Sequence, residues 1–299
     1  MLGLGVVPGA VLAAGMLVLP ESPRWLAGHQ RLPQAEAVLR RLRPPQADVA
    51  EELSALRTDL LREGGRLVPW SALLAPELRR ALIVGIGLAM FQQITGINTV
   101  IYFAPTIFES AGLPSASVSI LATAGVGVVN VALTVVAMWL IDRAGRRVLL
   151  LWSLGGMAVA LLVLAGGFAL GASGPLGWIT VLSLAVYVAF FAVGLGPVFW
   201  LLIAEIFPLA VRGRAMSLAT ISNWGFNLLV ALTFLSLINL FGRPGTFLIY
   251  AALTLVAIVF TATLVPETKG RSLEEIEDEL EGRRQPAPSA ARGRTQGVS

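Results

Sequence analysis

The chain alternates between long apolar stretches and shorter polar ones. Seven apolar segments can be marked, and each of the last six has the roughly 20 residues that a helix needs to cross the hydrocarbon core of a bilayer. The segments cover approximately residues 1–19, 79–103, 117–141, 148–171, 177–204, 214–241 and 245–265. Because a backbone in lipid must satisfy its own hydrogen bonds, the pattern predicts helices and not strands.

The longest polar stretch, residues 20–78, carries two shorter patterns of its own. Apolar residues recur at helical spacing over 32–42, stop at a pair of prolines, and recur again from Asp48 to about residue 61. This favours two short amphipathic helices, and a disordered linker is the alternative. Residues 282–299, rich in proline, glycine and arginine, are predicted to be disordered.

These patterns define an all-α membrane protein with four parts. The parts are one membrane helix over 1–19, a polar loop over 20–78, a six-helix bundle over 79–265 and a polar tail over 266–299. The first segment is not interpreted as a signal peptide. It lacks a basic region before the apolar stretch, and no small-residue cleavage site follows it.

Composition agrees with a bilayer environment, because 56% of the residues are hydrophobic and only 13% are charged. An ordinary globular domain has about 25% charged residues. Between Arg80 and Asp142, Glu109 is the only Asp, Glu, Lys, Arg or His residue. A soluble protein of that length would need charged helix faces that this stretch does not have.

The same composition removes several classes of function. There is no cysteine, and the single histidine, His29, lies in the polar stretch. We therefore expect no disulfide, thiol nucleophile, metal site or cofactor. Two Gly-Gly pairs lie in apolar helices without a P-loop lysine, and no nucleophile–base pair or paired acids stand out, so no enzyme is expected. Nucleic acid is not an expected partner either, since the basic residues form short clusters between apolar runs.

Positive charge follows the connections between segments in strict alternation. Of the 22 basic residues, all but Arg243 fall on one side of the membrane. The positive-inside rule makes that side, with the C-terminus, cytoplasmic. Only Lys269 is a lysine, and this bias toward arginine is typical of a GC-rich genome. We expect a multi-pass protein of a bacterial inner membrane.

Seven short motifs give a more specific indication. PESPR at 20–24 returns in altered form as PETKGR at 266–271, and each follows directly on an apolar segment. Transporters built from two related six-helix halves produce such an echo. The other motifs are QQITGIN at 92–98, DRAGRR at 142–147, GPVFW at 196–200, AEIFP at 204–208 and SNW at 222–224, with a tryptophan extending the first motif to residue 25. Together they resemble the sugar-porter family of the major facilitator superfamily, which includes glucose and xylose transporters.

The resemblance implies a fold and a function. The seven segments correspond to helices six to twelve of a twelve-helix transporter, so the first five helices have no counterpart here. The implied function is transport of a neutral sugar or polyol by alternating access, with proton coupling left open. A fragment, or a start codon assigned inside a longer reading frame, is the expected cause of the missing helices. The alternatives are a dimeric half-transporter, a membrane scaffold and a non-transporting sugar sensor.

Polar side chains in the second segment are the first candidates for substrate contact. Gln92, Gln93 and Asn98 carry amides, which can donate to and accept from sugar hydroxyls. In a regular helix Gln93 and Asn98 lie about 140° apart. Both face one cavity only if the helix breaks, and Gly96 is the predicted break. Hydrogen bonding between helices is the alternative role.

Further candidates come from three other segments. The resemblance assigns a cavity position to Asn130. Phe191 and Trp200 are candidates because aromatic faces stack on the apolar faces of sugar rings, and Asn223 and Trp224 are expected to line the cavity from the sixth segment. The alternative is that these residues only pack helices. Asn227 shares a helix face with Asn223. Ala192 stands where glucose transporters of the family commonly have an acidic residue, so their selectivity does not transfer.

Charged residues gather where three segments meet the cytoplasmic side. These residues help to fix the topology of the chain. The resemblance implies that they also form ion pairs that hold this side closed and that break when it opens. We expect Glu205 to lie within salt-bridge reach of one arginine of the DRAGRR motif. The candidate set is Asp142, Arg143, Arg146, Arg147, Glu205 and Arg212.

Overall fold

The computed structural model of the protein is built from helices in all the parts that it describes. These parts are residues 6–44, 47–62, 69–111, 115–171, 175–208, 211–271 and 275–276. The predicted disordered segment 282–299 lies outside them. The chain divides into two compact units, Met1–Val68 and Pro69–Ser299, so residues 69–78 of the predicted polar loop belong to the second unit.

The first unit contains four helices. They are α1 (Val6–Val18), α2 (Pro23–Gly28), α3 (Leu32–Leu42) and α4 (Val49–Arg62). The two amphipathic helices predicted from the sequence are thus confirmed as α3 and α4. The short helix α2 was not predicted. It begins where the Ser22 hydroxyl accepts a hydrogen bond of 3.2 Å from the backbone N–H of Trp25, with proline at the first helical position.

A small apolar core joins the three short helices. Leu26 and Ala27 of α2 are buried against Ala35 and Val38 of α3. The connection between α3 and α4 is braced by a bidentate pair in which Arg43 donates to Glu52 over 2.8 and 2.5 Å. Because both side chains are well exposed, this pair contributes little stability.

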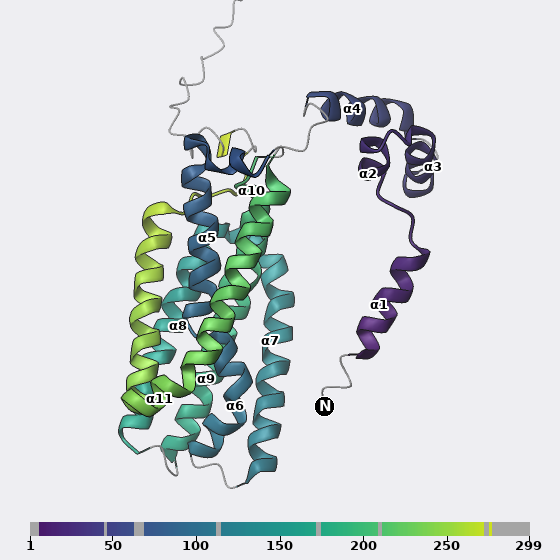
Figure 1. Ribbon diagram of the computed structural model, residues 1–299. Helices are drawn as coiled ribbons and strands as arrows, with labels where there is room; N and C mark the ends of the chain where they lie inside the picture. The colour runs from purple at the N-terminus through teal and green to yellow at the C-terminus, as the bar shows by residue number, and fades with distance from the viewer. Residues whose placement is uncertain are drawn as a thin grey trace, which may run out of the picture. The chain divides into compact units, whose positions relative to one another are not determined.

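The second unit is the transmembrane bundle (Figure 1). Two short 3₁₀ turns, η2 (Trp70–Leu74) and η3 (Pro76–Leu78), lead into it. Its helices are α5 (Arg79–Ile94), α6 (Ile97–Ser110), α7 (Ala116–Ala144), α8 (Arg146–Ala169), α9 (Pro175–Val193), α10 (Leu195–Glu205) and α11 (Arg212–Leu264).

Five stretches of the described chain are long and apolar enough to cross a bilayer. The last stretch, α11, has 53 residues, far more than the roughly 20 that one crossing needs. At Gly242, with φ 68°, the helix leaves helical geometry and the chain folds back (Figure 1). The bend separates the predicted segments 214–241 and 245–265, which gives six crossings.

The predicted ends of two segments differ from the observed helices. The second segment continues to Ser110, past residue 103, because α6 accommodates Pro105 within its length. The fifth segment is two helices, α9 and α10, divided at Gly194. Gly194, Gly196 and Pro197 together weaken a helix at this point, because glycine is a poor helix former and proline removes a backbone donor. The break falls at Gly194, the first of the three.

Helix packing brings distant parts of the chain together. α8 lies against both α9 and α11, and α5 lies against α11. The contacts are filled by fully buried large side chains such as Leu88, Phe199 and Tyr250. Other large apolar side chains remain exposed on the outside, for example Leu121 and Leu232. In water such a surface would be unfavourable, whereas the hydrocarbon of a bilayer accepts it.

Candidate functional site

A break between α5 and α6 lies at the centre of the candidate site. Gly96 has φ +95°, a left-handed conformation that side chains other than glycine rarely adopt. A Cβ atom there would also lie 2.6 Å from the ring of Tyr250. The carbonyl group of Thr95, left without a helical partner, accepts a hydrogen bond of 2.8 Å from the Tyr187 hydroxyl. The predicted helix break at Gly96 is confirmed.

Gln93 is the hub of an amide network that crosses this break. Its Nε2 donates to Gln92 Oε1 at 3.2 Å and to Asn223 Oδ1 at 3.1 Å. Its Oε1 accepts from Asn98 Nδ2 at 2.7 Å and from Asn227 Nδ2 at 3.0 Å. Both hydrogens and both lone pairs of the Gln93 amide are therefore used. The break brings Gln93 and Asn98 together as the sequence predicted.

Gln92 makes four hydrogen bonds of its own. Its Nε2 donates to the backbone carbonyls of Leu195 and Gly196 at 3.2 and 3.1 Å. Its Oε1 accepts from Asn223 at 2.6 Å as well as from Gln93. Gln92 thus ties α5 to the start of α10 and to α11. In this arrangement Gln92 forms hydrogen bonds between helices, which is the alternative role given above for these amides.

Hydrogen-bonding capacity remains on other members of the network. Asn98 and Asn227 each donate one hydrogen bond from Nδ2, so in the described part of the chain each keeps a second N–H group and a carbonyl oxygen without a partner. Asn98 is only half-buried. In the sequence Asn227 shares a helix face with Asn223 but was not selected for the site. Its hydrogen bond to Gln93 makes it a member of the network.

A second break, between α9 and α10, is held by Ser153 from α8. The buried Ser153 hydroxyl donates to the Phe190 carbonyl at 2.8 Å and accepts from the Leu195 N–H at 3.1 Å. At Gly194, with φ −127° and ψ −85°, the chain leaves helical geometry. Ser153 supplies the hydrogen bond that the break removes. A lone serine in an apolar helix gave no sequence signal for this role.

The remaining candidates lie outside the hydrogen-bonded network. Trp200 and Trp224 are exposed, at 42% and 61%, and Trp200 makes an edge contact with Phe199. Phe191 is half-buried. Asn130, on α7, borders a separate small cavity of about 70 Å³. The hydrogen-bonded network therefore contains four of the predicted residues, and these four lie outside it.

The charged candidates form a cluster at the opposite end of α10 from its break. Arg146 donates to Glu205 at 2.9 Å and lies 3.4 Å from Asp142. The second carboxylate oxygen of Glu205 accepts from the Thr268 hydroxyl at 2.5 Å. The expected contact between Glu205 and an arginine of the DRAGRR motif is confirmed, and the arginine is Arg146. A role of this contact in gating stays a prediction.

Three other arginines of the candidate set make different contacts. The Arg143 guanidinium lies 3.6 Å above the ring of Trp139. Arg147 donates to the carbonyl oxygen of Ala262. Arg212 donates to the Phe207 carbonyl at 3.0 Å. Among the ion pairs of the described chain, neither Arg143 nor Arg147 has a carboxylate within 4.0 Å.

Glu267 was not selected from the sequence, although its PETKGR motif was noted. Its carboxylate accepts from the backbone N–H groups of Arg146 and Arg147 at 2.9 and 3.1 Å. These groups begin α8, where free N–H groups and the helix dipole favour an anion. Burial raises the pKa of Glu267, but hydrogen bonds from Lys269, Arg146 and Arg147 lower it by more, so its pKa lies below the ordinary value.

The low pKa of Glu267 predicts a loss of stability in acid. A depressed folded-state pKa contributes stability above the ordinary pKa, about 4.3, and this stability is lost as pH falls through the folded value. The free energy of unfolding should therefore drop more between pH 5 and pH 3 for the unmodified chain than for Glu267→Gln. Denaturant titration in detergent micelles at the two pH values measures the difference. An equal drop in the free energy of unfolding for both proteins would show that the Glu267 carboxylate does not stabilise the start of α8.

Comparison with known proteins supports this architecture. The chain is 33% identical, with a TM-score of 0.73 over 92% of its length, to the proton:xylose symporter XylE bound to 6-bromo-6-deoxy-D-glucose, of which it covers 57%. It is 40% identical to a D-xylose transporter of Levilactobacillus brevis, matching 94% of this chain and 61% of that one. It is 38% identical to the galactose-proton symporter of Escherichia coli strain K12, over 94% of this chain and 60% of that one.

The fold and the apolar helices define a multi-pass membrane protein of the major facilitator superfamily. The sugar (and other) transporter family matches residues 1–280. The chain therefore belongs to the sugar-porter family, whose members are transporters and not enzymes. It spans about 61% of the length of the D-xylose transporter that it matches.

Proposed function

We propose that this chain supplies one wall of a sugar-binding site in a transporter that works by alternating access. The observation that carries the proposal is the amide network at the Gly96 break. It joins α5, α6 and α11 and leaves unpaired amide groups on Asn98 and Asn227. Sites of this kind in transporters lie near the bilayer midplane where helices are discontinuous.

The network also suggests how a sugar binds. A hydroxyl group both donates and accepts, so it can take the unused N–H and carbonyl groups of Asn98 and Asn227 directly. The hydroxyl binds Gln93 by taking the place of one of its amide partners, so the number of hydrogen bonds stays nearly constant. Trp200 and Trp224 offer aromatic faces for the apolar face of a sugar ring. We include Gln92, Asn130, Phe191 and Asn223 as further members of this wall.

The substrate class is inferred from relatives. Similar proteins are named as transporters of D-xylose, of galactose with a proton, and of polyols. We propose a neutral pentose, hexose or polyol as the substrate. Because alternating access requires two halves that move around the site, the opposite wall must come from the part of such transporters that this chain does not match.

The charged cluster fits a gate on the side that carries it. The pair between Arg146 and Glu205 is mostly buried, with side-chain exposures of 12% and 21%. Breaking such a pair leaves charges that need water. We propose that the pair, with Asp142 and Glu267, stabilises the closed state and separates when this side opens and hydrates.

Sugar uptake tests the proposed function. The chain is reconstituted into proteoliposomes alone, and joined to the part of the galactose-proton symporter that it does not match. Uptake of radiolabelled D-xylose, D-galactose and a polyol is then measured. We expect no uptake by the chain alone and uptake of at least one substrate by the joined protein. Uptake by the chain alone with Gln93 and Asn98 both replaced by leucine would contradict the proposal.

We further propose that the protein lies in a bacterial inner membrane with its C-terminal segment in the cytoplasm. The distribution of arginine supports this orientation. A cysteine at Ser115, the exposed N-cap of α7, should react with an impermeant maleimide added to intact cells. A cysteine at the exposed Ser54 of α4 should react only after lysis. Labelling of the Ser54 variant in intact cells would reverse the orientation.

A further inference from the structure

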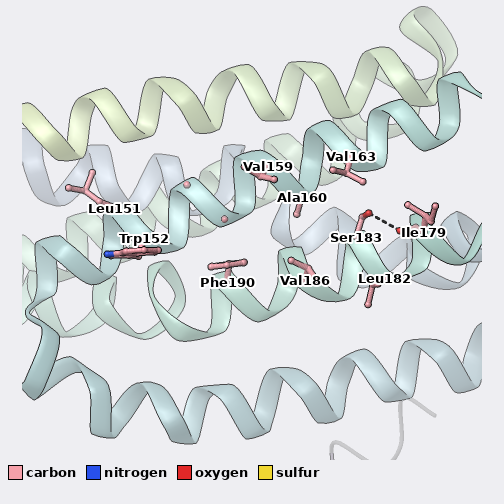
Figure 2. Close-up of a pocket in the computed structure, with 12 residues that line it drawn as sticks. Leu151, Trp152, Val159, Ala160, Val163, Ile179, Leu182, Ser183, Val186 and Phe190 are labelled. Carbon is pink, nitrogen blue, oxygen red and sulfur yellow. Dashed lines mark hydrogen bonds between the residues drawn. The ribbon is translucent and has the colours of Figure 1, made fainter. Parts of the chain in front are cut away.

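An apolar groove runs along the outside of the bundle between α8 and α9 (Figure 2). It consists of a cavity of about 770 Å³ and a neighbouring cavity of about 440 Å³. Trp152 and Phe190 line both cavities, so the two adjoin. Gly156 lets the Phe190 ring approach α8, because a Cβ atom there would lie 2.2 Å from that ring.

Apart from the indole N–H of Trp152, the side chains of the lining offer no free polar group. Side chains such as Val159 and Leu182 are more than 60% exposed and face outward. The Ser183 hydroxyl, also in the lining, already donates to the Ile179 carbonyl within its own helix at 2.7 Å (Figure 2). Groups of this kind match a hydrocarbon chain.

One end of the groove lies beside an unpaired cation. Ala144 and Val148 line this end, where α7 passes into α8. Arg143 is exposed, stacked on Trp139, and has no carboxylate partner among the described residues. Nearby carboxylates are already engaged: Glu205 binds Arg146, and Glu267 occupies the start of α8. An arginine beside an exposed tryptophan at a helix end is typical of the membrane interface, where lipid phosphates lie.

We propose that this groove binds an anionic phospholipid, with an acyl chain between α8 and α9 and the phosphate on the guanidinium of Arg143. From Val148 to Val163 the lining extends over sixteen residues of α8, about 22 Å of helix, enough for a chain that reaches past the middle of the bilayer. The inference requires only that the bundle spans a membrane and is independent of sugar transport.

Native mass spectrometry of the purified chain tests the site directly. The protein in detergent is titrated with dioleoyl phosphatidylglycerol and, separately, with dioleoyl phosphatidylcholine. One phosphatidylglycerol should be retained with an affinity about fivefold higher than that of phosphatidylcholine, since one arginine near a lipid surface contributes about that factor. Equal retention of the two lipids would reject the role of the anionic headgroup.

Two variants on different helices separate the chain contact from the charge contact. Gly155 lines the groove and has open space where a Cβ would stand, so Gly155→Leu fills the groove without a clash and should lower phosphatidylglycerol affinity about tenfold. Gly166→Leu, at an equally open position of α8 outside the lining, is the matched control. Arg143→Gln should remove the preference for phosphatidylglycerol, whereas Arg243→Gln, with its guanidinium near Phe168, should not.

Other occupants give distinguishable results. Inorganic phosphate that protects the protein from thermal unfolding as well as phosphatidylglycerol would show a free anion site and overturn the lipid assignment. A dimer that persists after delipidation and dissociates in Gly155→Leu would assign the groove to a second copy of the chain. Unchanged lipid retention in both Gly155→Leu and Arg143→Gln would place any bound lipid elsewhere.

Discussion

Gln93→Leu is expected to lower sugar uptake strongly in a full-length transporter that contains this chain. The substitution removes four hydrogen bonds at once and leaves amide groups of Asn98, Asn223 and Asn227 without their partner. Hydrogen bonds between membrane helices contribute about 0.6 kcal/mol each on average. The free energy of unfolding should therefore fall by about 2 kcal/mol, and uptake should fall at least about tenfold.

A serine on the same helix as Asn223 gives the matched control. The Ser222 hydroxyl donates to the Leu218 carbonyl of its own helix at 2.9 Å, so Ser222→Ala removes a bond that joins no helices. Its effect on stability should remain within about 0.5 kcal/mol. Denaturant titration and proteoliposome uptake are measured on both variants. Full uptake by Gln93→Leu would exclude this amide from the substrate site.

Gly194→Ala is expected to destabilise the bundle strongly. A Cβ atom at this position would lie 2.3 Å from Ser153 Cβ and 2.7 Å from the backbone oxygen of Leu149. The backbone oxygen cannot move without shifting α8, so the break between α9 and α10 must open. Overpacking of this kind costs about 3 kcal/mol, and loss of monodisperse protein in detergent is the expected observation.

The effect should be specific to the break. Gly166→Ala, where a Cβ meets open space, should retain or slightly raise stability, because alanine favours helix over glycine by up to about 1 kcal/mol. A second variant, Ser153→Ala, tests the same break by hydrogen exchange on peptides that cover Leu195. Its bundle should stay folded, and the Leu195 N–H should exchange faster because it no longer donates to the serine hydroxyl. Normal folding of Gly194→Ala with unchanged exchange would contradict this description of the break.

The sequence was most informative where a physical rule leaves few choices. A hydrocarbon core requires long apolar helices, and the bundle contains them. The two amphipathic helices of the first unit followed from spacing alone, as α3 and α4. The break at Gly96 was deduced because Gln93 and Asn98 could not share a face of a regular helix, and their hydrogen bond of 2.7 Å shows that they meet.

Sequence reasoning was weaker for roles that depend on the partner helix. Spacing along α5 does not distinguish a glutamine that faces a cavity from one that binds carbonyls of α10, as Gln92 does. The role of Ser153 depends on Gly194, which is distant in the chain, and nothing local to either residue indicates it. Glu267 could have been identified, because an acid just after a membrane helix needs a partner and the start of α8 lies on the same side.

The central claim is that these amides bind a sugar, and a structure of a full-length transporter containing this chain with bound D-xylose tests it most directly. We expect sugar hydroxyls within about 3 Å of the amides of Asn98, Asn227 and Gln93, with the ring beside Trp200. At least one amide–amide hydrogen bond of Gln93 should be replaced by a bond to the sugar. A well-ordered sugar that contacts none of these side chains, with the Gln93 network intact, would contradict the account.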